Sequence, residues 1–291
     1  MTSAAIWRAM MGFYIALFFL FLFGPLIVMG LSAFNTSQYP QAFPIEGLTL
    51  RWFGVLYGDR GLMEGLRNTV LIGILVVALS VPLGLAGALV MTQMYSRARS
   101  LYYLVVVSPV LTPGVILGIS TVIFWADVAE WTGVDSVYNG IFLATLGQST
   151  YISAYCMLIF LSRLQRYDRA QEEAALDLGA SPTQVFAHIL IPYLWPAIVS
   201  AVVIAFLSSF ENYNTTTFAI LADKTLTTVL AGRMRQGTTP AISALAVVII
   251  VVSIVGAIAF EVVRRAEANR EDARKRAADA AERAEMSAAA A

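Results

Sequence analysis

The sequence predicts an all-α polytopic membrane protein with six transmembrane helices. Of its 291 residues, 58% are hydrophobic and only 13% are charged. Soluble domains carry roughly 25% charged residues, so this composition is typical of a chain embedded in a bilayer. The charges are concentrated between long apolar segments, and six of these segments reach the roughly 20 residues that a helix needs to cross the hydrocarbon core.

The six predicted spans cover residues 11–33, 68–92, 101–125, 138–162, 196–220 and 239–263. The first is too long for the core of a signal peptide and no small-residue cleavage site follows it, which favours a retained span. We therefore expect three regions: a short N-terminal segment, a membrane domain and a charged tail. They cover residues 1–10, 11–263 and 264–291. The tail has favourable i,i+4 charge pairs but almost no large apolar residue, which predicts a solvated or frayed helix.

The distribution of positive charge predicts the orientation, because Lys and Arg collect on the cytoplasmic side. Of the 19 such residues, thirteen lie on the side of both termini and of segment 163–195, and six lie on the other. Without the tail the two sides are equal. The orientation then depends on the local density of arginines, which is highest in the short turn with Arg97 and Arg99 and in the three arginines within 163–169. We expect both termini and segment 163–195 to be cytoplasmic.

Residue types that support catalysis or metal binding are scarce. His188 and Cys156 are the only residues of their kinds, which argues against a metal site and against a Cys–His nucleophile pair. Neither lysine, Lys224 or Lys275, lies in a phosphate-binding GxxxxGK[ST] motif. We therefore expect no enzyme, no catalytic residue, no metal and no cofactor in this chain, with any ATP and Mg bound by a partner. The zero net charge gives no reason to expect nucleic acid.

Residues 163–195 form a long polar stretch between two apolar segments. Asp168 can cap a helix with Gln171 at its third position, and Gly179 suits the left-handed residue that ends such a helix. One face of this helix is small and apolar and the other is acidic. The small face has Ala174, Ala175 and Leu178, and the acidic face has Glu172, Glu173 and Asp177.

A second helix is predicted directly after this bend. Ser181 is its N-cap, Pro182 lies in its first turn and Gln184 is at the third position. We expect it to end near Leu190, with the following prolines starting the fifth span. Such a helix–bend–helix knob can dock into another protein. The same pattern also fits an amphipathic hairpin on the membrane surface. A DNA-binding helix-turn-helix fits less well, because its acidic face would repel phosphate.

Two spans contain residues that interrupt an apolar helix. Pro109 and Pro113 lie one turn apart in the third span, ahead of a Gly114-xxx-Gly118 pattern. This predicts either a notch for helix packing or a bent helix that lines a gated path. The fifth span contains the polar run Glu211, Asn212, Tyr213 and Asn214. A charge there is either at the membrane boundary or in a polar lining that meets a cationic substrate.

The spacing of Glu173-Ala174-Ala175, Gly179, Ile189 and Ile191-Pro192 resembles the EAA loop of permease subunits of ABC importers. The family usually has Leu before the proline, where this chain has Ile191. The resemblance implies the type I importer fold and a loop that contacts a separate ATPase. The implied ATPase-coupling residues are Glu172, Glu173, Ala174, Ala175, Asp177, Gly179, Ala180, Ser181 and Pro192.

The layout of the whole chain resembles the spermidine and putrescine branch of these permeases. The shared features are Leu50-Arg51-Trp52-Phe53, Arg67-Asn68-Thr69 and the polar break in the fifth span, where Glu211-Asn212 replaces the Asp pair often found in that branch. The resemblance implies import of a polyamine or similar cation through the bacterial inner membrane. It also implies a second permease subunit, two ATP-binding subunits and an extracytoplasmic solute-binding protein.

The sequence also allows two functions other than ATP-driven import. A secondary transporter or channel driven by an ion gradient would work without an ATPase, but no inverted repeat is evident in the sequence. A membrane scaffold that does not transport is a third possibility, but Glu211 and the spans interrupted by prolines argue against it.

Overall fold

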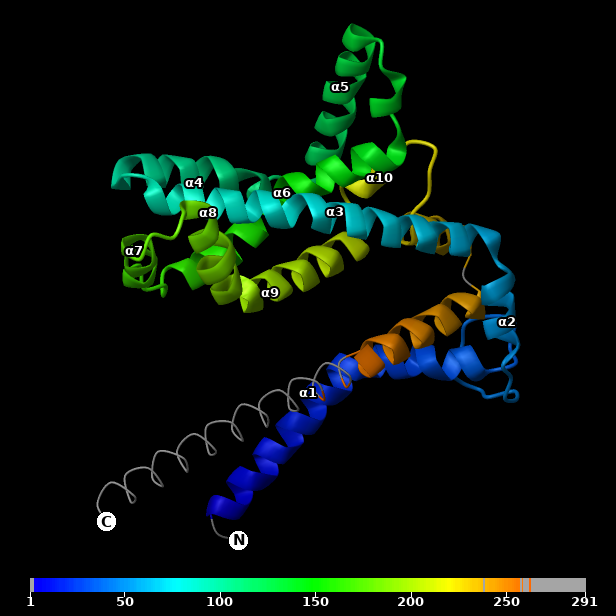
Figure 1. Cartoon of the computed structure of the whole chain (residues 1–291). Helices are drawn as coiled ribbons and strands as arrows, with labels where there is room; N and C mark the ends of the chain where they lie inside the picture. The colour runs from blue at the N-terminus through cyan, green and yellow to red at the C-terminus, as the bar shows by residue number, and fades with distance from the viewer. Residues whose placement is uncertain (1–2, 238, 257, 259–261, 263–291) are drawn as a thin grey trace, which may run out of the picture. The chain divides into compact units, whose positions relative to one another are not determined.

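The computed structural model describes residues 3–237, 239–256, 258 and 262. The chain divides into two compact units, Met1–Gly58 with Gly237–Ala291, and Asp59–Gln236. The regular elements in the described ranges are helices, with one isolated β-bridge between Asn35 and Leu48 (Figure 1). The predicted tail, 264–291, and the end of the sixth predicted span lie outside the described residues.

The first unit contains α1 (Ser3–Phe34), α2 (Arg51–Gly58) and the helix Pro240–Gly256. The loop between α1 and α2 is organised by Asn35. Its amide nitrogen donates to the carbonyls of Gln41 and Pro44, and its amide oxygen accepts from the Glu46 N–H. The backbone oxygen of Asn35 accepts from the Trp52 indole at 2.8 Å. This loop is therefore folded, and the segment between the first two predicted spans includes the helix α2.

The core of the second unit is formed by α3 (Arg60–Gln93), α6 (Gly140–Leu164) and α9 (Ile191–Phe210). Small residues allow these helices to approach closely. A Cβ added at Gly84 of α3 would lie 2.4 Å from the Cβ of Cys156 in α6. Cys156 is buried, as expected for a small hydrophobic residue.

The third predicted span, 101–125, is wrong as a single helix. Ser96–Leu111 forms α4 and Gly114–Thr132 forms α5. The break occurs because Pro113 disfavours helical geometry at Thr112, whose ψ is 131°. Figure 1 shows α4 alongside α3, with α5 leaving in a different direction. The proline pair therefore separates two helices.

Shorter helices complete the second unit. They are the 3₁₀ turn Asp135–Val137, α7 (Ala170–Asp177), α8 (Pro182–Val185), a π-helical turn Phe186–Leu190, α10 (Thr216–Ala219) and α11 (Leu226–Gln236).

Within the described residues, five helices are long and apolar enough to cross a membrane: Ile6–Phe34, Arg60–Gln93, Gly114–Thr132, Gly140–Leu164 and Pro182–Phe210. The apolar helix Pro240–Gly256 is shorter and corresponds to the start of the sixth predicted span. Most of α1 is exposed, including many large apolar side chains, as expected for a helix that faces lipid. The fifth predicted span ends early, because α9 stops at Phe210, just before the polar run.

Candidate functional site

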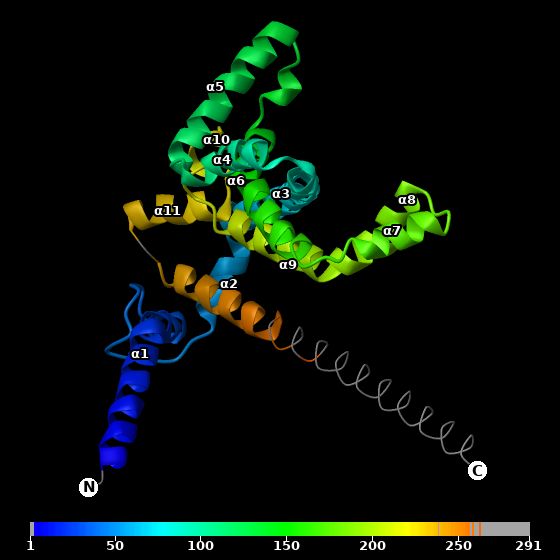
Figure 2. The same cartoon turned by 90° about the vertical axis from the view of Figure 1, so that its left-hand side faces the viewer.

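Two groups of candidate residues lie at opposite ends of α9. The predicted ATPase-coupling residues lie in α7, α8 and the turn between them, at the start of α9. The polar break lies where α9 ends. Figure 2 shows α7 and α8 together at one end of this helix and α10 and α11 at the other. The 20 residues of α9 separate the two groups by about 30 Å at 1.5 Å per residue.

The first helix of the loop begins one residue later than predicted. Its N-cap is Arg169, whose side chain makes no capping bond. Asp168 still contributes, since its Oδ1 accepts from the Ala170 N–H at 3.0 Å. The predicted capping box centred on Asp168 is therefore wrong, and the aspartate supports the helix from the preceding position.

The bend after α7 is confirmed as a left-handed glycine turn. Gly179 has a φ of +87°. The Ala180 N–H donates to the Ala175 carbonyl at 3.0 Å, and the Gly179 N–H donates to the Leu176 carbonyl at 2.9 Å. This pair of bonds defines a Schellman motif, in which a glycine satisfies the last carbonyls of a helix. The predicted bend follows from local chemistry alone.

The predicted start of the second helix is also confirmed. The Ser181 hydroxyl accepts from the Gln184 N–H at 3.4 Å, and the Ser181 N–H donates to the Gln184 side-chain oxygen at 2.8 Å. These two bonds form a capping box, with Pro182 in the first helical turn.

The second helix does not end near Leu190, contrary to the prediction. It continues through the π-helical turn into α9, so that Pro182–Phe210 is one helical rod. In an α-helix, Pro192 would lack the N–H for the His188 carbonyl and its ring would clash there. The π turn relieves this conflict, since the Ile191 N–H reaches back to the Phe186 carbonyl. Pro192 thus marks a widened turn and not a helix start.

The outer surface of the loop exposes both acidic and apolar groups. Glu173 and Asp177 are exposed, and so is Ala174. Leu178, at the bend, is 89% exposed, which is high for a leucine that follows a buried span. The acidic residues sit beside an apolar tip on a rigid two-helix knob.

The base of the loop is tied to the membrane helices by arginines. The guanidinium of Arg163 lies 4.4 Å from the centroid of the Tyr193 ring and donates to the Tyr193 carbonyl at 3.4 Å. The Tyr193 hydroxyl donates back to the Arg163 carbonyl at 3.2 Å. Arg169 donates to the Thr92 carbonyl at the end of α3, also at 3.2 Å. The base of the loop is therefore connected to α3, α6 and α9.

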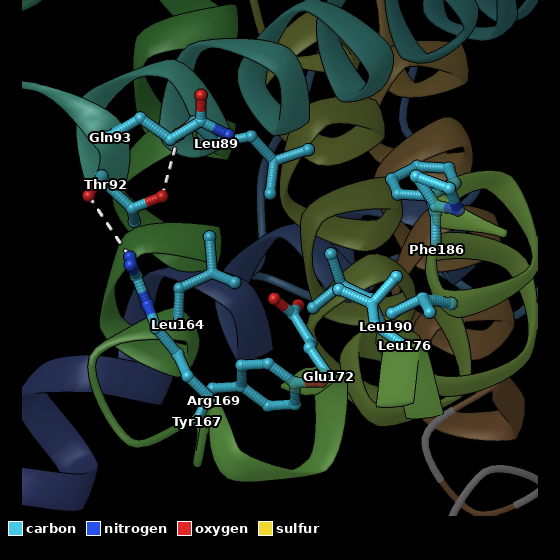
Figure 3. A pocket seen from close by; sticks show the side chains of 12 residues that line it. Leu89, Thr92, Gln93, Leu164, Tyr167, Arg169, Glu172, Leu176, Phe186 and Leu190 are labelled. Carbon is cyan, nitrogen blue, oxygen red and sulfur yellow. Dashed lines mark hydrogen bonds between the residues drawn. The ribbon is translucent and has the colours of Figure 1, made fainter. Parts of the chain in front are cut away.

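A cavity of about 320 Å³ lies beneath the knob (Figure 3). Leu89 and Thr92 of α3 line one side, and Glu172 and Leu190 line the other. Tyr167 closes its lower edge. Burial raises the pKa of the Tyr167 hydroxyl, and the nearby Glu172 carboxylate raises it further. The cavity therefore lies between α7 and the ends of α3 and α6.

At the other end of α9, Asn212 organises the polar break. Its side-chain oxygen accepts from the Thr216 N–H at 3.0 Å and from the Thr216 hydroxyl at 2.8 Å. Its side-chain nitrogen donates to the Tyr151 hydroxyl at 2.7 Å. The backbone oxygen of Asn212 accepts from Thr227 at 2.9 Å. Asn212 is thus a structural centre, whereas Glu211 beside it is exposed.

Several functional candidates at the break were missed by the sequence analysis. Gln148 of α6 is 1% exposed and donates to the Thr216 hydroxyl at 2.8 Å, while its oxygen accepts from Ser209. Tyr151, one turn further on, holds Asn212. The available signal was a glutamine inside an apolar span, because buried polar groups in a membrane require partners.

The glycines of α5 fit the packing interpretation of the Gly114-xxx-Gly118 pattern. A Cβ at Gly118 would lie 2.5 Å from the Thr215 carbonyl oxygen, and one at Gly114 would lie 3.1 Å from the Asn214 Cβ. Only residues without a Cβ permit this approach. Pro113, the N-cap of α5, is therefore next to the break, while Pro109 lies in the last turn of α4.

The segment after the break is fastened to α3. Lys224 accepts through its carbonyl from Asn68 at 2.9 Å, and the Leu226 N–H donates to Thr69 at 2.8 Å. Arg233 of α11 forms an ion pair with Asp59, the N-cap of α3, at 2.6 Å. The hydrogen bond from Arg233 lowers the pKa of Asp59. Tyr213 accepts a longer bond, 3.3 Å, from Arg235.

No cluster of His, Cys, Asp and Glu suited to a metal occurs among the described residues.

Comparisons with known proteins agree with this arrangement. Residues 80–268 match the family model described as "Binding-protein-dependent transport system inner membrane component". The putrescine transport system permease protein PotI of Escherichia coli (strain K12) is 31% identical over 256 residues, which cover 87% of this chain and 90% of PotI. The spermidine/putrescine transport system permease protein PotC homolog of Mycoplasma pneumoniae is 27% identical over 267 residues, covering 87% and 89%.

Solved structures confirm the fold class. A bacterial ABC transporter involved in import of the acidic polysaccharide alginate matches with a TM-score of 0.65 and 20% identity, covering 86% of this chain and 91% of that chain. The alginate transporter in complex with a pentasaccharide-bound periplasmic protein matches with a TM-score of 0.63, again at 20% identity, covering 86% and 90%. The chain is a multi-pass protein, and it belongs to the family of inner membrane components of binding-protein-dependent transport systems.

Proposed function

We propose that this chain forms part of the translocation path of an ATP-driven importer whose cargo is a polyamine such as putrescine. The main support is the likeness to PotI, named a putrescine permease, over 87% of this chain. The polar break at the end of α9 adds chemical support. Its exposed carboxylate, Glu211, suits a cationic cargo, whereas an acidic cargo would be repelled there.

The knob of α7 and α8 is the proposed contact with the ATPase. Its Schellman bend and capping box give it a fixed shape, and its exposed Glu173, Asp177 and Leu178 offer both charge and an apolar anchor. A rigid rod from Pro182 to Phe210 would carry movement of the knob to the polar break. The Arg163 and Arg169 contacts would transmit the same movement to α6 and α3.

The proposed assembly contains this chain, a second permease subunit, two ATP-binding subunits that hold ATP and Mg, and a solute-binding protein. Both termini and the knob would face the cytoplasm, as the distribution of arginines predicts. The polar break would then lie toward the side from which the solute-binding protein delivers cargo.

Reconstitution tests this proposal. Liposomes containing the full assembly, with ATP and Mg on the knob side and a solute-binding protein on the other, should take up putrescine. Liposomes containing this chain alone should not. Uptake by the chain alone under an ion gradient would instead identify a secondary transporter or channel.

The contact with the ATPase is tested separately. Glu173→Lys should leave membrane insertion unchanged and abolish the link between ATP hydrolysis and uptake, because it reverses charge on the docking face. Glu130→Lys, a matched change at an exposed position of α5, should leave that link intact. Normal uptake by Glu173→Lys would rule out this docking face.

A further inference from the structure

Three features that attract a cation meet where α9 ends: the Glu211 carboxylate, the carbonyl end of α9, and a pair of tyrosines on α6. We propose that they form a binding site for a primary alkylammonium group on the translocation path. This inference rests on the proposed amine cargo, and it assigns Tyr151 and Tyr155 a role that the sequence did not suggest.

Glu211 supplies the charge. Its side chain is exposed, and no ion pair or hydrogen bond engages it within the part of the chain that the structure describes. Its backbone is fixed, because the Glu211 N–H donates to the Leu207 carbonyl at 3.1 Å. A carboxylate at the end of a membrane helix is costly without a counter-ion, so a cationic ligand is favoured there.

The end of α9 adds a second attraction. A helix of 20 residues presents the negative end of its dipole at its last carbonyls, which stabilises a nearby cation. The following α10 presents the opposite end. However, Asn212 accepts from the Thr216 N–H at 3.0 Å and so satisfies one donor of that helix start. One donor at the start of α10 is thus occupied, while the Glu211 carboxylate at the end of α9 stays exposed.

The tyrosines provide aromatic faces. Tyr151 and Tyr155 lie one turn apart on α6, with ring centroids 5.9 Å apart and planes at 87°. Both are half-buried, so part of each ring is accessible. The bond from Asn212 holds the Tyr151 hydroxyl at 2.7 Å and thereby fixes that ring beside the neighbour of Glu211.

This set of groups selects for an ammonium. A carboxylate accepts the N–H donors of an alkylammonium, and the face of a tyrosine attracts the same charge. A neutral alcohol of equal length can donate one hydrogen bond to the carboxylate but has no charge to be attracted by the carboxylate or by the tyrosine face. The site is also open, because Glu211 is exposed, and a site on a transport path must release its ligand.

The effect of the Glu211 charge on the electrostatic potential near Tyr155 can be measured in membranes of cells that express the full chain. Tyr155→Cys should react with a cationic and a neutral methanethiosulfonate reagent, while the native Cys156 is buried. Adding Glu211→Gln should lower the ratio of the cationic to the neutral rate about threefold, as expected when one partly screened charge is removed. Adding Glu130→Gln, at an exposed carboxylate on α5, should leave the ratio unchanged. An unchanged ratio with Glu211→Gln would overturn the site.

Uptake by the assembled transporter provides the second measurement. Glu211→Gln should reduce putrescine uptake about tenfold, because the cargo loses one charge-assisted interaction with the site. Glu211→Asp and Tyr155→Phe should retain most uptake, while Tyr155→Leu should lose it. ATP hydrolysis stimulated by the solute-binding protein should persist in all four, which excludes misfolding. In excess, 1-butylamine should inhibit wild-type uptake more than 1-butanol does.

The two measurements separate failure of the site from failure of the proposed function. A wild-type assembly that imports no diamine, together with a charge ratio that depends on Glu211, would overturn the polyamine function and leave the cation site standing. Normal putrescine uptake by Glu211→Gln would overturn the site and leave the function standing.

Discussion

The two ends of α9 depart from the sequence-based expectation in opposite directions. At the loop end, two prolines and a polar segment would be expected to stop a helix, yet the helix continues through a π turn. At the other end, an apolar segment would be expected to continue to residue 220, yet the helix stops at Phe210. The bend and the helix cap at the loop end depend on residues close together in sequence, although Arg163 and Arg169 connect its base to more distant residues. The break end depends on α3, α5 and α6, which are distant in sequence.

This difference has a consequence for mutation. A change at the loop end should alter one element and spare the rest of the membrane domain. A change at the break end should affect several helices at once, because Thr215 contacts α5, Asn212 and Thr216 contact α6, and Leu226 contacts α3. The predictions below test this contrast, in order of decreasing effect.

Gly118→Ala should have the largest effect on stability. The added Cβ would lie 2.5 Å from the Thr215 carbonyl, a backbone atom that cannot move away freely. Overpacking of this kind costs about 1–3 kcal/mol. Thermal unfolding of the purified protein should show a lowered midpoint. The control is Gly232→Ala in α11, where nothing lies within 4 Å of the added Cβ. Equal midpoints for both variants would contradict the close packing of α5 on the break.

Gly179→Val should lower stability less than Gly118→Ala does but remove coupled uptake. A β-branched residue is strained at a φ of +87°, by about 1–2 kcal/mol, and would reshape the bend. The expected result is normal insertion with ATP hydrolysis that no longer drives uptake. Gly179→Asn is the matched control, because asparagine tolerates left-handed geometry. If Asn and Val behave alike, the shape of the bend is not what matters.

These two glycines also show how far the sequence could predict the structure. Gly179 was predicted correctly because the Schellman turn needs only the neighbouring residues, and the Ser181 capping box was predicted for the same reason. The partners of Gly118 and of Gln148 could not be predicted, since they come from segments about 70 to 100 residues away. The sequence does not predict the π turn, because a proline usually ends a helix, whereas a widened turn can accommodate it.

Arg163→Lys should produce a smaller effect, at the junction between the loop and the spans. Lysine keeps the positive charge but loses the planar stacking on Tyr193 and the paired bonds to its carbonyl. Uptake per ATP hydrolysed should fall about three- to tenfold, which corresponds to roughly 1 kcal/mol of lost coupling. Arg166→Lys, at an exposed position three residues later, is the control. An equal fall in both would assign the effect to general loop chemistry.

Ser181→Ala should cost about 1 kcal/mol, the usual value of an N-cap, and only at the loop end. Hydrogen exchange should increase in α8 and remain unchanged in α10 and α11. Thr183→Ala, two residues along the same helix, should have less effect because that hydroxyl does not cap the helix start. Faster exchange at the break end would contradict the local character of the loop.

The smallest expected effect is the dependence of the break end on pH. Arg233 lowers the pKa of Asp59, whose ordinary value is 3.8, so the folded state favours the charged carboxylate. The stabilisation is therefore complete above the ordinary pKa and is lost as pH falls through the lower, folded pKa. For a partly exposed ion pair its size is at most about 1 kcal/mol. The protection factors of the α11 amides, measured relative to the intrinsic exchange rate at each pH, should fall in acid for the wild type, whereas Asp59→Asn should show the lower protection already at pH 7. This ion pair joins segments distant in sequence, so the change in exchange should reach α11. A change confined to residues next to Asp59 would mean that the structure at the break end depends on neighbouring residues only, as the bend at the loop end does.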